Sequence, residues 1–183
     1  MLAHLSAVSG RVRSGATRQP DVMSELSRLR REIQGEVLSH FREEELALFP
    51  VLGRHVDASS GPIPVLMEGH AQFRQLELEF EEALAAIESD YPDGWPDKLC
   101  DAADAIGRLL PPHTEKEDGV LFPMAESMLE ESEWTEVDRL WRDAIAAASE
   151  PGVHLAATGS GSLTSSARGR RDWSTRDHTP QQT

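Results

Sequence analysis

The chain has 183 residues, enough for one domain of ordinary size with a single sizeable core. Apolar residues make up 39% and charged residues 27%, a balance typical of a globular domain rather than a fibrous chain. The formal net charge of −14 would repel phosphate backbones, so we do not expect nucleic-acid binding. The single cysteine, Cys100, excludes an internal disulfide and a cysteine-rich zinc module.

The sequence predicts neither a membrane span nor a secretory signal. No apolar run approaches the length that crosses a bilayer. The opening MLAHLSAVSG is too short for a signal peptide, and its arginines follow the apolar residues instead of preceding them. A lone cysteine suits a reducing compartment. We therefore expect a cytoplasmic protein.

Apolar residues recur in steps of three and four, which predicts helices and not strands. The predicted helices cover residues 2–13, 22–52, 65–89, 97–124 and 133–148. Four principal antiparallel segments with short connections predict an all-α fold, an up-down-up-down four-helix bundle over residues 1–149, with the short fifth helix across one end or side. From Pro151 onward Gly, Ser, Thr, Arg and Gln dominate, which predicts a disordered tail over residues 150–183.

Two local signals refine the fourth predicted helix. Asp97, after a Pro- and Gly-rich turn, is a suitable N-cap. The pair Pro111-Pro112 is expected to kink or restart the helix, because proline lacks a backbone N–H and its ring crowds the preceding turn.

Polar residues interrupt the apolar faces of these helices. An unpaired buried charge costs on the order of several kcal/mol, so such residues need compensation in a core. Cations would provide it, since carboxylates and neutral imidazoles are natural metal ligands. The interrupting residues are His4, His40, Glu44, His70, His113 and Glu117.

Two of these pairs belong to a duplicated sequence. His40–Pro50 and His113–Pro123 both read His-x-x-x-Glu-acid-x-x-Leu-Phe-Pro. The spacing of four places histidine and glutamate one turn apart on the same helix face, so both side chains can reach one centre. The Leu-Phe-Pro endings are interpreted as packing and helix termination.

This duplicated frame, with the intervening Glu68-Gly69-His70, resembles hemerythrin-like proteins, the HHE cation-binding domain family, over about residues 3–124. The resemblance implies a four-helix bundle with a non-haem di-iron site, in which carboxylates and an oxo or hydroxo group bridge two iron ions. It implies no catalytic residue beyond the metal ligands, and it makes Glu44 and Glu117 the bridging carboxylates. The implied ligands are His4 from the first helix, His40 and Glu44 from the second, His70 from the third, and His113 and Glu117 from the fourth.

The chain departs from the family pattern at Arg74, where hemerythrins have a further histidine one turn after the first. An arginine cannot ligate, and we expect it to turn aside toward a carboxylate such as Glu77. The site is then one imidazole short, and its additional open positions favour reaction over reversible oxygen carriage. His4 stands where helices fray, so a surface position is its alternative reading.

Two functions remain open at this point. The first is a reaction with a small oxidant, with hydrogen peroxide preferred in a catalase-like reaction and dioxygen or nitric oxide as other small ligands. The alternative is a non-catalytic iron or oxygen sensor, or an iron-storage module. A metal-free bundle is disfavoured because it would strand the polar residues in the core.

Overall fold

The computed structural model describes residues 1–15, 19–57, 59–88 and 94–148, and within these ranges the regular elements are all helical. Helix α1 (Leu2–Arg13) has the predicted bounds. The second helical rod runs without interruption through α2 (Pro20–Glu32), the π-helical segment η1 (Ile33–Val37), α3 (Leu38–Glu43), the π-helical segment η2 (Glu44–Leu48) and α4 (Phe49–Leu52).

The third rod is the single helix α5 (Pro62–Glu88). The fourth comprises α6 (Trp95–Lys116), the π-helical segment η3 (Glu117–Leu121) and α7 (Phe122–Met128). A last helix, α8 (Glu131–Ala148), follows after a short break. The predicted tail, residues 150–183, lies outside the described residues.

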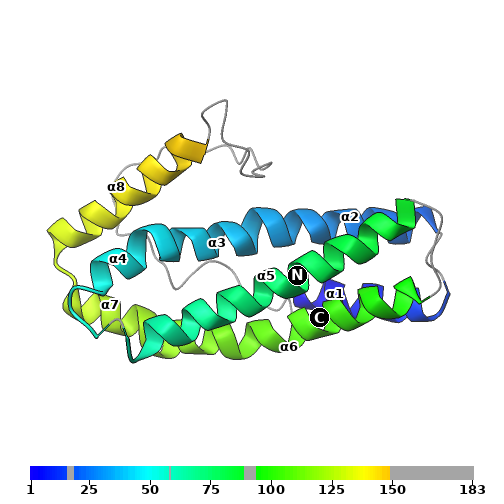
Figure 1. Ribbon diagram of the computed structural model, residues 1–183, viewed down its shortest axis with the longest axis horizontal. Helices are drawn as coiled ribbons and strands as arrows, with labels where there is room; N and C mark the ends of the chain where they lie inside the picture. Colours follow the sequence, from blue (N-terminus) through cyan, green and yellow to red (C-terminus); the bar gives the residue numbers. More distant parts are fainter. Residues whose placement is uncertain (16–18, 58, 89–93, 149–183) are drawn as a thin grey trace, which may run out of the picture.

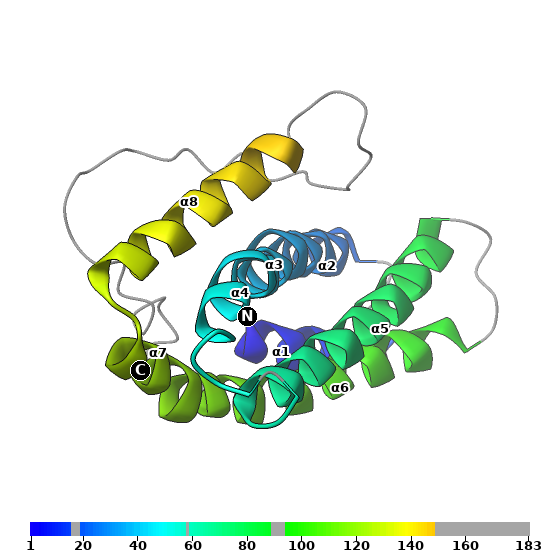
Figure 2. The same cartoon turned by 60° about the vertical axis from the view of Figure 1, so that its left-hand side comes forward.

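The rods form the predicted all-helical bundle (Figure 1). The α5 rod packs against α6, and the short α1 packs against α6 and α2. Helix α8 contacts η2 and α4 and then points away from the bundle (Figure 2). Within the described ranges, no helix combines the length and the apolar character needed to cross a membrane.

The fourth rod differs from its prediction in two places. It begins at Trp95 rather than after Asp97, because Gly94 adopts a φ of 87°, a left-handed conformation that suits glycine, and so starts the helix earlier. It also passes through Pro111-Pro112 without a break. Both prolines are exposed, so the backbone carbonyls that lose a donor lie on the accessible side of the helix, where water can bind them.

The leucine and phenylalanine of each Leu-Phe-Pro sequence pack in the core as predicted, but the sequences do not end their helices, so the predicted termination was wrong. A π-helical segment precedes each proline, and the wider turn accommodates a residue that lacks an N–H. The N–H of Phe49 donates to the carbonyl of Glu44, and that of Phe122 donates to the carbonyl of Glu117. Both copies of the duplicated frame therefore open their π segment at the glutamate.

The π segment in the fourth rod also shifts which residue enters the core. A regular step of three residues from Glu117 would bury Val120, but Val120 is 46% exposed, while the next residue, Leu121, is fully buried. A π turn contains more residues than an α turn, so the stripe advances by one position.

The core consists of two apolar clusters with a polar layer between them. Along α5, Leu66 belongs to one cluster and Phe73 to the other, and His70 lies between them. Cluster 1 is formed by α1, α2, α5 and α6 and includes Val8, Leu26, Phe73, Phe80, Leu99 and Ile106. Cluster 2 is formed around α4, α7 and α8 and includes Leu48, Leu52, Leu66, Leu121, Phe122 and Val137.

Candidate metal centre

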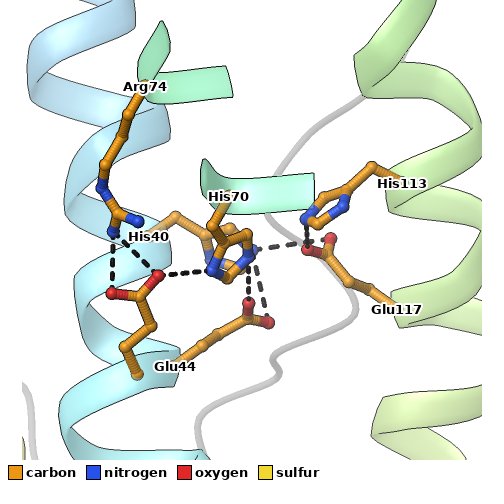
Figure 3. Close-up of polar contacts among 7 residues, drawn as sticks. His40, Glu44, His70, Arg74, His113 and Glu117 are labelled. Atoms are coloured by element: carbon orange, nitrogen blue, oxygen red, sulfur yellow. Dashed lines mark hydrogen bonds and ion pairs between the residues drawn. The ribbon is translucent and has the colours of Figure 1, made fainter. Parts of the chain in front are cut away.

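Five of the six residues implied as ligands lie together in the polar layer (Figure 3). They come from three rods and converge on one place inside the bundle. Their positions are His40 on α3, Glu44 at the start of η2, His70 on α5, His113 on α6 and Glu117 at the start of η3.

The ligand atoms form two groups that share Glu117. One group is His70, His113 and Glu117, and the other is His40, Glu44 and Glu117; in each, the ligand atoms lie within 4.8 Å of one another. Glu117 Oε1 is 2.8 Å from His113 Nε2, and Glu117 Oε2 is 3.6 Å from His40 Nε2. The carboxylate thus presents one oxygen to each group.

Glu44 also lies between the two groups. Its Oε1 is 3.6 Å from His40 Nε2, and its Oε2 is 3.3 Å from His70 Nε2. Two carboxylates that each face imidazoles on both sides form the arrangement expected for bridging a pair of cations.

Five of the donor atoms are buried and make no hydrogen bond of normal geometry. Among the described residues, these atoms include both carboxylate oxygens of Glu44, Glu117 Oε1, and the Nε2 atoms of His70 and His113. Leaving polar atoms dry and unpaired is costly, and a positive ion compensates such a set directly. Nitrogen and oxygen donors in this mixture suit iron, zinc or manganese, so the residues present fit a metal centre.

The two glutamates have opposite pKa shifts. Burial, with the nearby charges of Glu117, Glu43 and Glu45, raises the pKa of Glu44 well above its ordinary value of 4.5. Burial also acts to raise the pKa of Glu117, but the imidazoles of His113 and His40 outweigh it and lower that pKa to about 2. One carboxylate is therefore held as an anion by its neighbours, and the other is not.

Arg74 turns away from the ligand layer, but its partner is Glu45 and not the predicted Glu77. Arg74 Nη2 donates to both carboxylate oxygens of Glu45, at 2.8 and 2.7 Å. Glu77 instead accepts a hydrogen bond of 3.4 Å from Gln34.

The same glutamate orients His70. His70 Nδ1 lies 2.7 Å from Glu45 Oε1, and because an ionised carboxylate only accepts, the Nδ1–H donates. The Nε2 lone pair of His70 then faces Glu44. Burial acts to raise the pKa of Glu45, but His70 and Arg74 outweigh it and lower that pKa. A ligand histidine held by a carboxylate through its second nitrogen is typical of metal sites.

The two acids that flank Glu44, Glu43 and Glu45, do not lie on a solvated face. Glu43 is buried and Glu45 is mostly buried. The duplicated acid after each glutamate was the signal in the sequence that could have identified Glu45.

Aromatic rings fix the planes of the imidazoles. Phe41 stacks on His70 with ring centroids 3.8 Å apart and meets His113 edge-on at 5.1 Å. Phe49 stacks on the ring of His70 at 5.9 Å. These contacts add apolar walls to the ligand layer, and the sequence pattern did not assign them.

His4 does not join either ligand group. Its side chain is 45% exposed, and its Nδ1 is 3.7 Å from Glu32 Oε2. Glu32 precedes His40 by about two helical turns on the second rod. His4 lies in the first turn of α1, and this end of the helix meets the second rod before the ligand layer rather than at it. The structure therefore supports the surface alternative for this residue.

Imidazoles and carboxylates that are gathered in two groups inside a helical bundle are typical of metal-binding helical bundle proteins. The sequence model of the Hemerythrin HHE cation binding domain family matches residues 1–125 and, in a second overlapping match, residues 61–149. The chain therefore belongs to this family. No curated protein and no solved structure matched the chain in the corresponding comparisons.

The overlap of the two family matches agrees with the internal repeat. The third and fourth rods carry His70 and then the His113/Glu117 pair. The first and second rods carry His4 and then the His40/Glu44 pair, in the same order. One half of the bundle therefore resembles the other in sequence as well as in helix order.

Proposed function

We propose that the protein is a non-haem di-iron protein that reacts with a small oxidant, and that hydrogen peroxide, in a catalase-like reaction, is the preferred one. The proposed ligands are His40, Glu44, His70, His113 and Glu117. The observation that carries the proposal is that Glu117, itself buried, belongs to both ligand groups and offers one oxygen to each.

The number of donors supports a reactive centre over a closed structural one. Two six-coordinate cations need about twelve donor atoms, and three imidazoles with two bridging carboxylates supply about seven. Without His4 and with Arg74 turned aside, the remaining positions are open to water, hydroxide or an exogenous ligand.

The family to which the chain belongs binds metal ions, usually iron, which favours iron over zinc or manganese. A pair of irons, when bound, supplies exchange of electrons with a peroxide or dioxygen molecule. The protein supplies the rest. Glu44 and Glu117 would offset part of the charge of the cations, Glu45 fixes the tautomer of His70, and Phe41 excludes water from its ring face.

The oxidant approaches on the side of His40. This histidine is 22% exposed, whereas His70 and His113 are buried. We infer that a small molecule would reach the ligand layer past this partly exposed histidine rather than through the buried group.

The test is to load metal-free protein with Fe(II) without oxygen, measure iron per chain by elemental analysis, and titrate with hydrogen peroxide. We expect about two irons per chain, a change in the ultraviolet-visible spectrum, and consumption of peroxide that Glu117→Gln abolishes. Full iron loading with no peroxide consumption and no binding of dioxygen or nitric oxide would contradict the reaction and favour the sensor or storage alternative.

A further inference from the structure

Gly69 lies directly against the imidazole of His113. A Cβ atom built on Gly69 would be 2.6 Å from His113 Nδ1, 3.0 Å from Cε1 and 3.8 Å from Cγ. Real Cβ atoms essentially never approach a neighbour closer than 3.0 Å, so any larger residue at this position forces a displacement. We propose that Gly69 is a positioning residue, whose missing side chain leaves the space that His113 needs to direct Nε2 at the metal.

The position of Gly69 in its helix makes this absence informative. It lies within α5 (Pro62–Glu88), far from either end. Glycine in a helix interior costs about 1 kcal/mol relative to alanine, so the residue is unfavourable for the helix itself. The close approach of α6 is the feature of the structure that requires it.

His113 has little room to move away from α5. Its side chain is 4% exposed, and its ring meets those of Phe41 and His70 at 5.1 and 4.9 Å. The other ring nitrogen, Nε2, is 2.8 Å from Glu117 Oε1. A displacement caused by a methyl group at residue 69 therefore changes the direction of Nε2 relative to Glu117.

The effect should be confined to one ligand group. Gly69 touches His113, which belongs with His70 and Glu117. His40 and Glu44 form the other group together with Glu117. The helix α5 thus contributes one ligand, His70, and through the adjacent glycine sets the position of a second.

The inference rests on the proposed function only in taking His113 as a metal ligand; the steric contact is tested separately in metal-free protein. Gly69→Ala is compared with Gly107→Ala, a helical glycine whose added Cβ meets nothing within 4 Å. Gly107→Ala should raise the melting temperature by about 2–4 °C through helix propensity. Gly69→Ala should lower it instead.

The contact with His113 is isolated by a double-mutant cycle. In a His113→Ala background, the methyl group at residue 69 has free space, so Gly69→Ala should now raise the melting temperature as Gly107→Ala does. Equal effects of Gly69→Ala in both backgrounds, or a rise in the wild-type background, would overturn the inference.

Metal binding is the second readout. Gly69→Ala should weaken iron binding by about 10- to 100-fold, in the range of other residues that orient ligands, while Gly107→Ala leaves it unchanged. Unchanged iron affinity in Gly69→Ala would contradict the positioning role. If wild-type protein itself binds no iron, the proposed function fails, and the melting-temperature cycle still decides whether Gly69 makes room for His113.

Discussion

The two copies of the His-x-x-x-Glu frame have the same local geometry and different surroundings. In both, the glutamate opens a π-helical segment, and both carboxylates reach the same buried layer. His40 is 22% exposed, however, while His113 is 4% exposed. The pKa of Glu44 is raised and that of Glu117 is lowered to about 2.

The difference shows that the repeated sequence sets the direction of the two glutamate side chains, whereas the residues packed around each glutamate set its pKa. Glu117 has an imidazole 2.8 Å away and a second one at 3.6 Å. Glu44 has imidazoles only at 3.3 and 3.6 Å among the ion pairs of the described residues, and three acids raise its pKa further. Two copies of one pattern thus provide one carboxylate that its neighbours hold as an anion and one whose ionised form burial disfavours.

The largest expected effect is on iron affinity, which should fall further when Glu117 is replaced than when Glu44 is replaced. Glu117→Gln removes the residue common to both groups, so the chain should lose most of its iron, with affinity lowered by more than about 100-fold. Glu44→Gln should retain more iron, since the group of His70, His113 and Glu117 stays complete. Elemental analysis after equilibrium dialysis measures both variants; equal retention would contradict the unequal roles.

The next largest effect is on the free energy of unfolding and concerns the core positions that follow Glu117. Leu121→Ala should lower the free energy of unfolding by about 3 kcal/mol, because it empties a fully buried site. Val120→Ala, one residue earlier and 46% exposed, should change it by less than about 0.5 kcal/mol. Urea unfolding curves of both variants measure these losses. A larger loss of stability in Val120→Ala than in Leu121→Ala would contradict the shift that the π segment causes.

The opposite pKa shifts predict a pH dependence for the metal-free protein. Glu44 binds its proton more tightly in the folded state, so its contribution to stability is complete below about 4.5 and is lost as the pH rises through its raised pKa. Glu117 contributes stability above 4.5, and this is lost as the pH falls through about 2.

Glu44→Gln should therefore stabilise the metal-free protein more at pH 7 than at pH 4, because glutamine resembles the protonated carboxyl that burial favours and cannot ionise as the pH rises. Glu117→Gln should destabilise it at the same pH. Thermal unfolding in the presence of a chelator, from pH 4 to pH 8, follows both variants. A Glu44→Gln protein that loses stability at neutral pH would show that the two glutamates do not differ as described.

The smallest expected effect concerns Arg74. Arg74→Met removes the guanidinium that holds Glu45 but leaves the His70–Glu45 hydrogen bond intact, so iron affinity should fall by about 10-fold. Arg139→Met, which breaks an exposed pair with Asp143, is the matched control and should leave the affinity unchanged. A competition titration with a coloured chelator measures the iron affinity of both variants. Equal affinities in the two would show that Arg74 does not support the metal ligands.

The sequence predicts the helices and four of the site residues, but not every residue that enters the core. Periodicity locates all the rods, since each buries one apolar face, and the repeat predicts His40, Glu44, His113 and Glu117 as neighbours, which the structure brings together. Whether they ligate a metal stays a prediction. Periodicity assumes a constant turn, so it could not foresee the π segments that bury Leu121 in place of Val120.

Contacts between rods were not accessible from the sequence. The pairing of Arg74 with Glu45, the position of His4 beside Glu32 and the space left by Gly69 all depend on how helices approach one another. Helix spacing of three and four residues defines faces, but it does not define the distance between two faces or their offset along the bundle axis.

The polar layer divides the bundle into two apolar halves. Between cluster 1 and cluster 2 lie buried donor atoms that make no hydrogen bond of normal geometry. Ions bound there would join the halves into one cooperative unit, and their removal would let each half exchange its amide protons independently. The availability of metal would then control how cooperatively the whole molecule unfolds, as well as its chemistry.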